Sequence, residues 1–485
     1  MNKRKFWLVL LPLAFTTVFS CKNLLEIEET DFIGGSAALR TVANNESLLM
    51  GAYEALGTEM AIRLNGVFSD ELRVGEFYNA QTTHEWLYAP ADIGLRDNYT
   101  ATTPLYRVID RANRVLEALP DAIAESDADE ALRERVRGEA LFLRAFSHFE
   151  LFRYYCGNYD AEGLGMPYME LPSLDNQARI GMGEYFEKML RDINEAKPLL
   201  ADDLSDIYRA NRLSAVALHA RVALYMRQWN DAITYATEYI EAIPLSSRED
   251  FPGIWTDDND NELSWKLNRT TANRVGSIYR SLFTRNSSGA LVVPSTISWT
   301  PSNKLWDAFD QENDVRFGAY LIDEPLLAAV ANKPHRLVNK YAGTGYATTN
   351  ENVADLKIFR TAEMYLIRAE ARSESGAFSG VNSAESDINE LRKNRIDGYQ
   401  NVTFASSDEA IEAVLFERFK ELAFEGHRFW DLKRRELPVV RTGDDVPSNQ
   451  GTTLPANDFR FVLPIPQPEI QANPLMEQNP GYGSN

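Results

Sequence analysis

The sequence predicts a mostly α-helical protein in which paired helices form a frame around an irregular, loop-rich region with a few short strands. Three observations support this fold class. Apolar residues recur at three- and four-residue spacing over long segments, as in amphipathic helices. Two segments have the layout of helical hairpins. Between them, residues 244–358 are richer in Pro, Gly, Ser, Thr and Asn, and the helical periodicity weakens.

Long packed helices are predicted in the first third of the chain. Residues 44–57 (NNESLLMGAYEALG) and 104–120 (PLYRVIDRANRVLEALP) have helical apolar spacing, and prolines bound the second segment. Residues 132–155 (LRERVRGEALFLRAFSHFELFRYY) continue this spacing over about six turns. We expect each helix to bury one apolar side.

Residues 213–242 and 359–395 predict two helical hairpins. In the first, an Ala-rich helix ends at Tyr225 and a second helix follows Trp229; in the second, the break falls at Gly376. Small residues let paired helices approach closely. The layout resembles the tetratricopeptide unit, although neither copy matches its strict consensus.

The irregular middle contains a predicted short strand, in which Leu263, Trp265 and Leu267 alternate with other residues. Trp265 and Trp306 are expected in the core. The acidic run DDNDNE includes Asp257, Asp258 and Asp260, which could hold calcium. A solvated polar loop is the favoured interpretation, because the run lacks the glycine and the final glutamate of an EF-hand.

Composition limits the class of protein. The 485 residues are 44% apolar and 11% aromatic, enough for a sizeable core. With 50 basic and 71 acidic residues the net charge is −21, which disfavours nucleic acid as a partner. Beyond the N-terminal segment, no apolar run reaches the roughly 18 residues of a membrane helix.

The N-terminus predicts a signal peptide over residues 1–20. Three basic residues precede an apolar run that extends to Phe19, and Ser20 and Cys21 follow. The sequence TVFSC resembles a bacterial lipobox, which implies lipidation of Cys21. An ordinary signal peptide with a chance cysteine is the alternative. Only Cys156 remains besides Cys21, so the chain has no intrachain disulfide framework.

Residues 416–436 (FERFKELAFEGHRFWDLKRRE) combine charges and aromatic rings densely enough to suggest an active site. His427 could act as a base, but the segment has no Ser or Cys nucleophile, and the five histidines lack metal-site spacing. The favoured interpretation is structural: a helix capped near Gly426, with an internal ionic network. The network would comprise Arg418, Glu421, Glu425 and Arg428.

Four separated blocks resemble the SusD/RagB family of nutrient-binding outer-membrane lipoproteins. They are RGEALFLRAFSHFELFRYYCGNY with GMPY, AEMYLIRAEARSESG with DINELRKNR, FERFKELAFEGHRFWDLKRR, and LPIPQPEIQANPLMEQNPGY. The resemblance implies a SusD-like domain over residues 21–485. Its parts would be a tetratricopeptide-like superhelical frame (36–243 and 359–436), a ligand-region elaboration (244–358) and an irregular C-terminal segment (437–485).

The same resemblance implies a function. The protein would bind oligosaccharides outside the cell, anchored by lipid to the outer membrane, and deliver them to a SusC-like TonB-dependent transporter. It would not be an enzyme and would need no cofactor. A peptide-binding member of the family, or a tetratricopeptide-type scaffold for protein partners, are the alternatives.

One loop combines the groups that sugar binding requires: flat aromatic faces, and planar polar groups for hydroxyls. It covers residues 69–90 (SDELRVGEFYNAQTTHEWLYAP), and the resemblance places it opposite residues 277–283 and 295–303. The predicted ligand-binding residues are Arg73, Tyr78, Asn79, Trp86, Tyr88, Tyr279, Arg280, Trp299 and Asn303. A core role is a nearly equal alternative for Trp86 and Trp299, and Asp70 and Glu71 could serve the frame.

Overall fold

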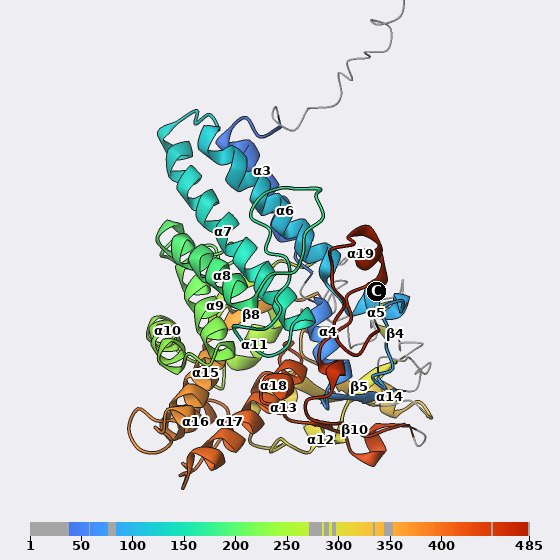
Figure 1. The fold of residues 1–485 in the computed structure, drawn as a ribbon. Helices are drawn as coiled ribbons and strands as arrows, with labels where there is room; N and C mark the ends of the chain where they lie inside the picture. Colours follow the sequence, from blue (N-terminus) through green and yellow to red (C-terminus); the bar gives the residue numbers. More distant parts are fainter. Residues whose placement is uncertain are drawn as a thin grey trace, which may run out of the picture.

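A computed structural model describes residues 38–57, 59–75, 84–270, 284–285, 291–292, 297–332, 335–343, 353–447 and 450–483. Helices form a continuous layer along one side of the molecule, and short strands and helices gather beside its lower part (Figure 1). This arrangement confirms the mostly α-helical fold class with a few short strands.

The helices up to the middle region are α3 (Val42–Ala55), α4 (Glu59–Phe68), α5 (Ile93–Asn98), α6 (Thr102–Ala118), α7 (Asp127–Tyr155), α8 (Met182–Ala196), α9 (Arg212–Tyr225) and α10 (Trp229–Ala242). The later helices are α11 (Phe251–Thr256), α12 (Asn303–Trp306), α13 (Val315–Tyr320), α14 (Pro325–Ala328), α15 (Thr361–Glu374), α16 (Ala384–Lys393), α17 (Ser407–Glu421), α18 (Arg428–Arg434) and α19 (Gln467–Ala472). Short 3₁₀ helices are η1 (Leu119–Asp121), η2 (Lys197–Leu199), η5 (Gly443–Asp445) and η6 (Phe459–Phe461).

The described strands form antiparallel pairs. They are β1 (Leu72–Val74) with β5 (Trp299–Pro301), β2 (Leu263–Leu267) with β8 (Leu356–Arg360), β3 (Thr284–Arg285) with β4 (Leu291–Val292), β6 (Leu321–Asp323) with β7 (Arg336–Val338), and β9 (Val439–Val440) with β10 (Thr453–Leu454). The predicted strand is β2, and Trp265 and Trp306 are buried as expected.

The predicted hairpins are α9 with α10 and α15 with α16. Helix α10 packs on both α9 and α15, and α15 packs on α17, so the two hairpins join into one layer. At the seam, Ala232 and Ala236 of α10 are fully buried and let its neighbours approach closely. A buried Asn211 begins α9 with a reciprocal capping box to Ser214.

Helix α7 differs from the expected one-sided helix. From Gly138 to Tyr155 every residue is buried, because α3, α6, α8 and α9 surround this half of the helix. Its buried charges are paired: both nitrogens of the Arg144 fork meet Asp192 at 2.6 and 2.7 Å, and Arg153 meets Glu150 at 2.5 Å. A charged residue in this sequence is therefore not necessarily exposed to solvent.

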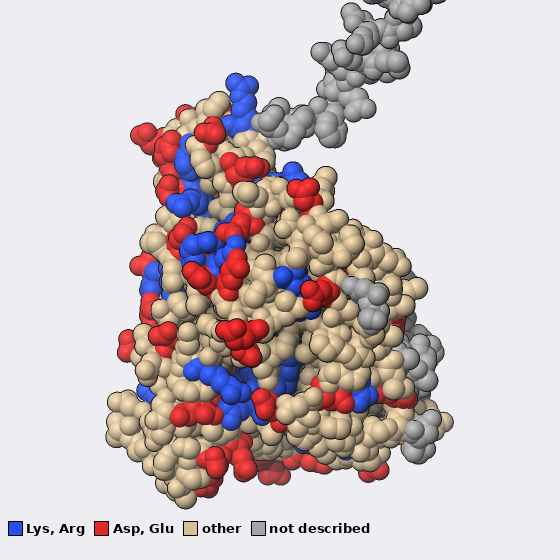
Figure 2. All heavy atoms as spheres, viewed as in Figure 1, with Lys and Arg blue, Asp and Glu red and all other residues tan. Residues whose placement is uncertain are grey.

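Within the described residues, none of the helices combines the length and apolarity needed to cross a bilayer. On the face shown in Figure 2, acidic and basic side chains are interspersed, and large areas carry no charge. The excess negative charge is therefore not gathered into one patch on this face.

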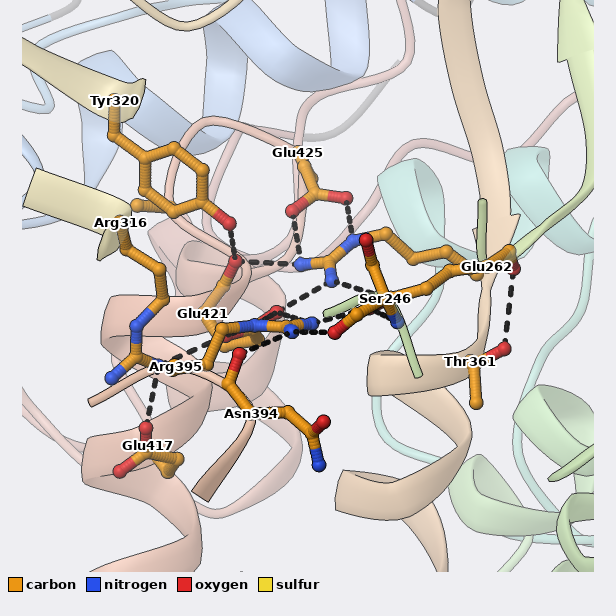
Figure 3. Close-up of polar contacts among 12 residues, drawn as sticks. Ser246, Glu262, Arg316, Tyr320, Thr361, Asn394, Arg395, Glu417, Glu421 and Glu425 are labelled. Carbon is orange, nitrogen blue, oxygen red and sulfur yellow. Dashed lines mark hydrogen bonds and ion pairs between the residues drawn. The ribbon is translucent and has the colours of Figure 1, made fainter. Parts of the chain in front are cut away.

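The charged segment 416–436 braces the fold, as the structural interpretation predicts. At its centre, buried Glu421 meets the guanidinium groups of Arg316 at 2.9 Å and Arg395 at 3.1 Å (Figure 3). A third guanidinium, that of Arg360, lies 2.6 Å from Glu421. We call these four residues the Glu421 network. Burial opposes ionisation, but the charges of the three arginines outweigh it and hold the pKa of Glu421 well below its ordinary value.

Further ion pairs extend the Glu421 network to neighbouring elements. Glu425 binds Arg360 and Lys340, each at 2.7 Å, and Glu262 binds Arg395 at 2.6 Å. The network thus ties α17 to α13, β8 and the strand β2 region. The predicted roles of Glu421 and Glu425 in an internal ionic network are confirmed.

The other two predicted members are also paired. Arg418 meets Asp431 at 2.7 Å, and Arg428 meets Asp70 at 2.8 Å. One detail of the prediction is wrong: α17 ends at Glu421, several residues before Gly426. Gly426 instead lies in the turn between α17 and α18, at φ +82°, with its backbone close against α4.

Candidate functional site

Strands β1 and β5 bring the predicted loop and the irregular middle together. Arg73 lies opposite Thr300 and Val74 opposite Trp299 in this antiparallel pair. The Arg73 guanidinium donates to the Asn303 side-chain oxygen at 3.2 Å, across 230 residues of sequence. The expected adjacency is therefore present between the loop and residues 299–303, whereas residues 277–283 lie outside the described residues.

Asn303 is positioned by the first turn of α12. The Ser302 hydroxyl accepts from the Leu305 N–H and donates to the Asp70 carbonyl, which fixes the start of the helix beside β1. The Asn303 N–H donates to the buried Asp445 carboxylate at 2.9 Å. The Asn303 side chain is left partly exposed and directed at Arg73.

A second guanidinium approaches the same oxygen. Arg336, at the start of β7, has a nitrogen 3.5 Å from the Asn303 side-chain oxygen and lies over the Trp306 ring at 4.4 Å. Arg73 is also 3.9 Å from Asp445, and its side chain is 35% exposed. We call Arg73, Asn303, Arg336 and Asp445 the arginine cluster.

The neighbouring acidic residues serve the frame. Asp70 is held by both Arg428 and Lys304, and these charges overcome burial to keep its pKa well below the ordinary range. Glu71 is fully buried, and burial raises its pKa to about 8. Glu71 accepts the Phe424 N–H at 3.2 Å, which links it to the turn after α17.

The predicted aromatic residues of the loop are packed inside the fold. Trp86 is 2% exposed and its indole N–H donates to the Phe68 carbonyl at 2.9 Å. The Tyr88 ring stacks on Phe68 at 5.1 Å, and its hydroxyl donates to the Arg460 carbonyl. In this structure neither ring offers a face to a ligand, so the core alternative fits Trp86 better, and Tyr88 is packed in the core rather than placed as its predicted ligand role requires.

Trp299 is 7% exposed and lies beside His84, with ring centroids 5.4 Å apart. Burial, together with the charge of Arg441, lowers the pKa of His84 to about 3, so this imidazole is neutral. Trp299 is therefore buried on β5, one residue before the position that lies opposite Arg73. Tyr78, Asn79, Tyr279, Arg280 and Cys21 are outside the described residues, and their predicted roles stay predictions.

Sequence reasoning missed Arg336, Asp445 and Arg441. Arg441 fastens the loop by donating to the carbonyls of Val67, Ser69 and His84, and its guanidinium lies 4.1 Å from the Trp86 ring centroid. Asp445 and Arg441 are far in sequence from the loop that they contact, Arg336 contacts Asn303 and Trp306 instead, and no local pattern marks any of the three.

The histidine and the acidic run singled out by sequence are engaged within the fold. His427 is buried, and burial together with the charges of nearby arginines lowers its pKa well below the ordinary value. Asp257 pairs with Lys357 at 2.6 Å and Asp260 with Lys266 at 2.7 Å. Across the part of the chain that the structure describes, no three His, Cys, Asp or Glu side chains form a metal-binding group.

Comparison with known protein families gives matches at both ends of the described chain. A family model for the SusD family matches residues 332–482. A second, described as starch-binding and associating with the outer membrane, matches residues 37–224. Together the two models match most of the helical frame and of the C-terminal segment, and they leave residues 225–331 between them.

Individual relatives span nearly the whole chain. SusD-like protein P38 of Formosa agariphila is 25% identical and covers 96% of this chain and 96% of its own length. A SusD superfamily crystal structure from Bacteroides thetaiotaomicron has a TM-score of 0.76 at 24% identity, with 91% of this chain and all of that chain covered. A surface glycan-binding protein A from Bacteroides fluxus has a TM-score of 0.70 at 21% identity, covering 91% and 99%. Both family models, a full-length relative and the shared fold agree in identifying this chain as SusD-like.

Proposed function

We propose that this protein binds oligosaccharides at the cell surface and delivers them to a SusC-like TonB-dependent transporter. The observation that carries the proposal is the arginine cluster. It presents partly exposed, planar polar side chains of Arg73, Asn303 and Arg336 from three separate elements. Planar amide and guanidinium groups are suited to sugar hydroxyls.

In this proposal the protein binds its ligand reversibly and does not cleave it. Equilibrium capture suits a protein that must release its ligand to a transporter, and it needs neither bond cleavage nor a cofactor. His427 is buried and neutral within the charged segment 416–436, and this is consistent with a structural role for that histidine. The names of the family models and of the glycan-binding relative point in the same direction.

The first experiment measures ligand binding. Isothermal titration calorimetry of residues 21–485 against a panel of polysaccharides should give binding to at least one glycan. The variant Arg73→Ala should weaken it about tenfold or more, because a charge-assisted hydrogen bond is worth roughly 1.5–3 kcal/mol. Arg107→Ala, an exposed arginine on α6, is the matched control and should bind as wild type.

The alternatives are outcomes of the same panel. Binding to peptides but to no glycan would replace the proposal by peptide capture. If the protein binds neither glycans nor peptides but its helical frame captures folded proteins, the tetratricopeptide-type scaffold would be favoured. Unchanged glycan binding in Arg73→Ala would show that the ligand site lies elsewhere.

The location and the partner need separate tests. We propose that lipid on Cys21 anchors the protein to the outer membrane, facing the exterior. Cys21→Ala should then release it from the membrane fraction, and continued retention would contradict the anchor. Affinity purification of the lipidated protein from its native membrane should recover a TonB-dependent transporter in comparable amount.

A further inference from the structure

In the arginine cluster, two positively charged guanidinium groups lie close to one uncharged amide oxygen. Nitrogens of Arg73 and Arg336 lie 3.2 and 3.5 Å from the same side-chain oxygen of Asn303. An amide oxygen carries only a partial negative charge. Two guanidinium groups in such proximity repel each other unless an anion lies nearby.

The carboxylates around the cluster do not neutralise both groups. Asp445 lies 3.9 Å from Arg73, too far for a hydrogen bond, and its two oxygens accept from the Asn303 N–H and the Thr442 hydroxyl. Among the described residues, no carboxylate lies within ion-pair distance of Arg336. Its cross-strand partner Asp323 pairs with His335 at 2.6 Å instead.

Local structure holds both guanidinium groups in place. Arg73 extends from β1, which is paired with β5, and Arg336 extends from β7, which contacts β5. The Trp306 ring, itself packed against Phe317 at 4.9 Å, supports the flat face of Arg336. Both arginines are partly exposed, so their remaining N–H groups can reach a ligand.

We infer that the arginine cluster binds an anionic substituent of the ligand, a uronate carboxylate or a sulfate ester. Both groups present coplanar or clustered oxygens that match guanidinium donors. The inference rests on the proposed function and deepens it: the preferred ligand is an acidic glycan. A local excess of positive charge is notable in a chain of net charge −21, which otherwise repels such ligands.

The experiment compares three oligosaccharide probes of similar length by calorimetry: a neutral glucan, an oligogalacturonate and a sulfated galactan. Wild type should bind one of the acidic probes at least tenfold more tightly than the neutral one, and the preference should fall with added salt. The carboxylate and sulfate probes separate the two sources of charge. Arg336→Gln should remove most of the preference, and Arg336→Lys should retain part of it.

Two controls keep the test decisive. Arg107→Gln removes one positive charge from exposed α6 and should leave the preference unchanged. Sodium sulfate alone should raise the melting temperature of wild type and Arg107→Gln more than that of Arg336→Gln. This second measurement reports the anion site without any glycan.

The outcomes separate the two proposals. Equal or tighter binding of the neutral glucan, with no effect of Arg336→Gln, would overturn the anion site and leave glycan binding intact. A sulfate effect that depends on Arg336, with no binding of any glycan, would support the anion site and overturn the glycan proposal. Absence of both effects would overturn both.

Discussion

Replacing Glu421 by glutamine should strongly destabilise the protein. The substitution keeps the shape of the side chain but removes the charge that faces Arg316, Arg360 and Arg395, all of them buried. Removing one partner of a single buried ion pair costs about 3–5 kcal/mol. We expect a loss of at least about 3 kcal/mol, a large part of the total stability of roughly 5–15 kcal/mol.

Urea unfolding followed by tryptophan fluorescence measures this loss. The control is Glu195→Gln, whose carboxylate is 47% exposed and lies 3.7 Å from Arg137; it should cost about 1 kcal/mol or less. The pKa of Glu421 is depressed, so its contribution is complete above its ordinary value of 4.5 and is lost as the pH falls below it. Wild type should therefore show an acid sensitivity that the variant lacks. A loss below about 1 kcal/mol in Glu421→Gln would refute this account of the network.

Three further predictions concern residues around the site. The folded-state pKa of Glu71 is raised from 4.5 to about 8, so the free energy of unfolding should fall as the pH rises through this range. By pH 7 this fall should amount to roughly 3 kcal/mol, and Glu71→Gln should abolish it; urea titrations at several pH values measure both. Gly426→Ala should lower the melting temperature more than Gly398→Ala: both have positive φ, but only at Gly426 would a Cβ meet backbone, at 3.3 Å. Equal shifts would show that the contact with α4 is unimportant. Trp86→Phe should cost about 1–3 kcal/mol, because the buried Phe68 carbonyl loses its donor. Calorimetry should give unchanged glycan affinity; weakened binding at unchanged stability would restore Trp86 to the ligand site.

The helical frame could be predicted because the spacing of apolar residues shows which side of a helix is buried. The segment predicted at 104–120 is α6, at Thr102–Ala118, and the segment at 213–242 divides into α9 and α10 as expected. Burial on all sides of α7 could not be predicted, since its charges looked exposed. The carboxylate that neutralises Arg144 is Asp192 on another helix, and no local pattern reveals this pairing.

The candidate site was predicted only in part. Arg73 and Asn303 have the right side chains in irregular segments, and the structure brings them together. Trp86 was ambiguous because its sequence neighbours are polar, whereas its spatial neighbour Arg441 comes from a segment 355 residues later. Arg336 was missed because its partner is a side-chain oxygen on α12, and only the folded chain places the two together.

The Glu421 network joins residues that are synthesised far apart in time, so we expect it to form late. Among the described residues, the carboxylates that pair with Arg360 are Glu262, at 3.4 Å, Glu421 and Glu425, and the last two are synthesised after Arg360. Burying a guanidinium group without enough carboxylates to neutralise it costs free energy. Packing of the middle region against the second hairpin should therefore be only weakly favourable before the C-terminal helices are present. The growing chain should stay open until its C-terminal helices arrive, and fragments that stop before residue 417 should be readily digested by proteases.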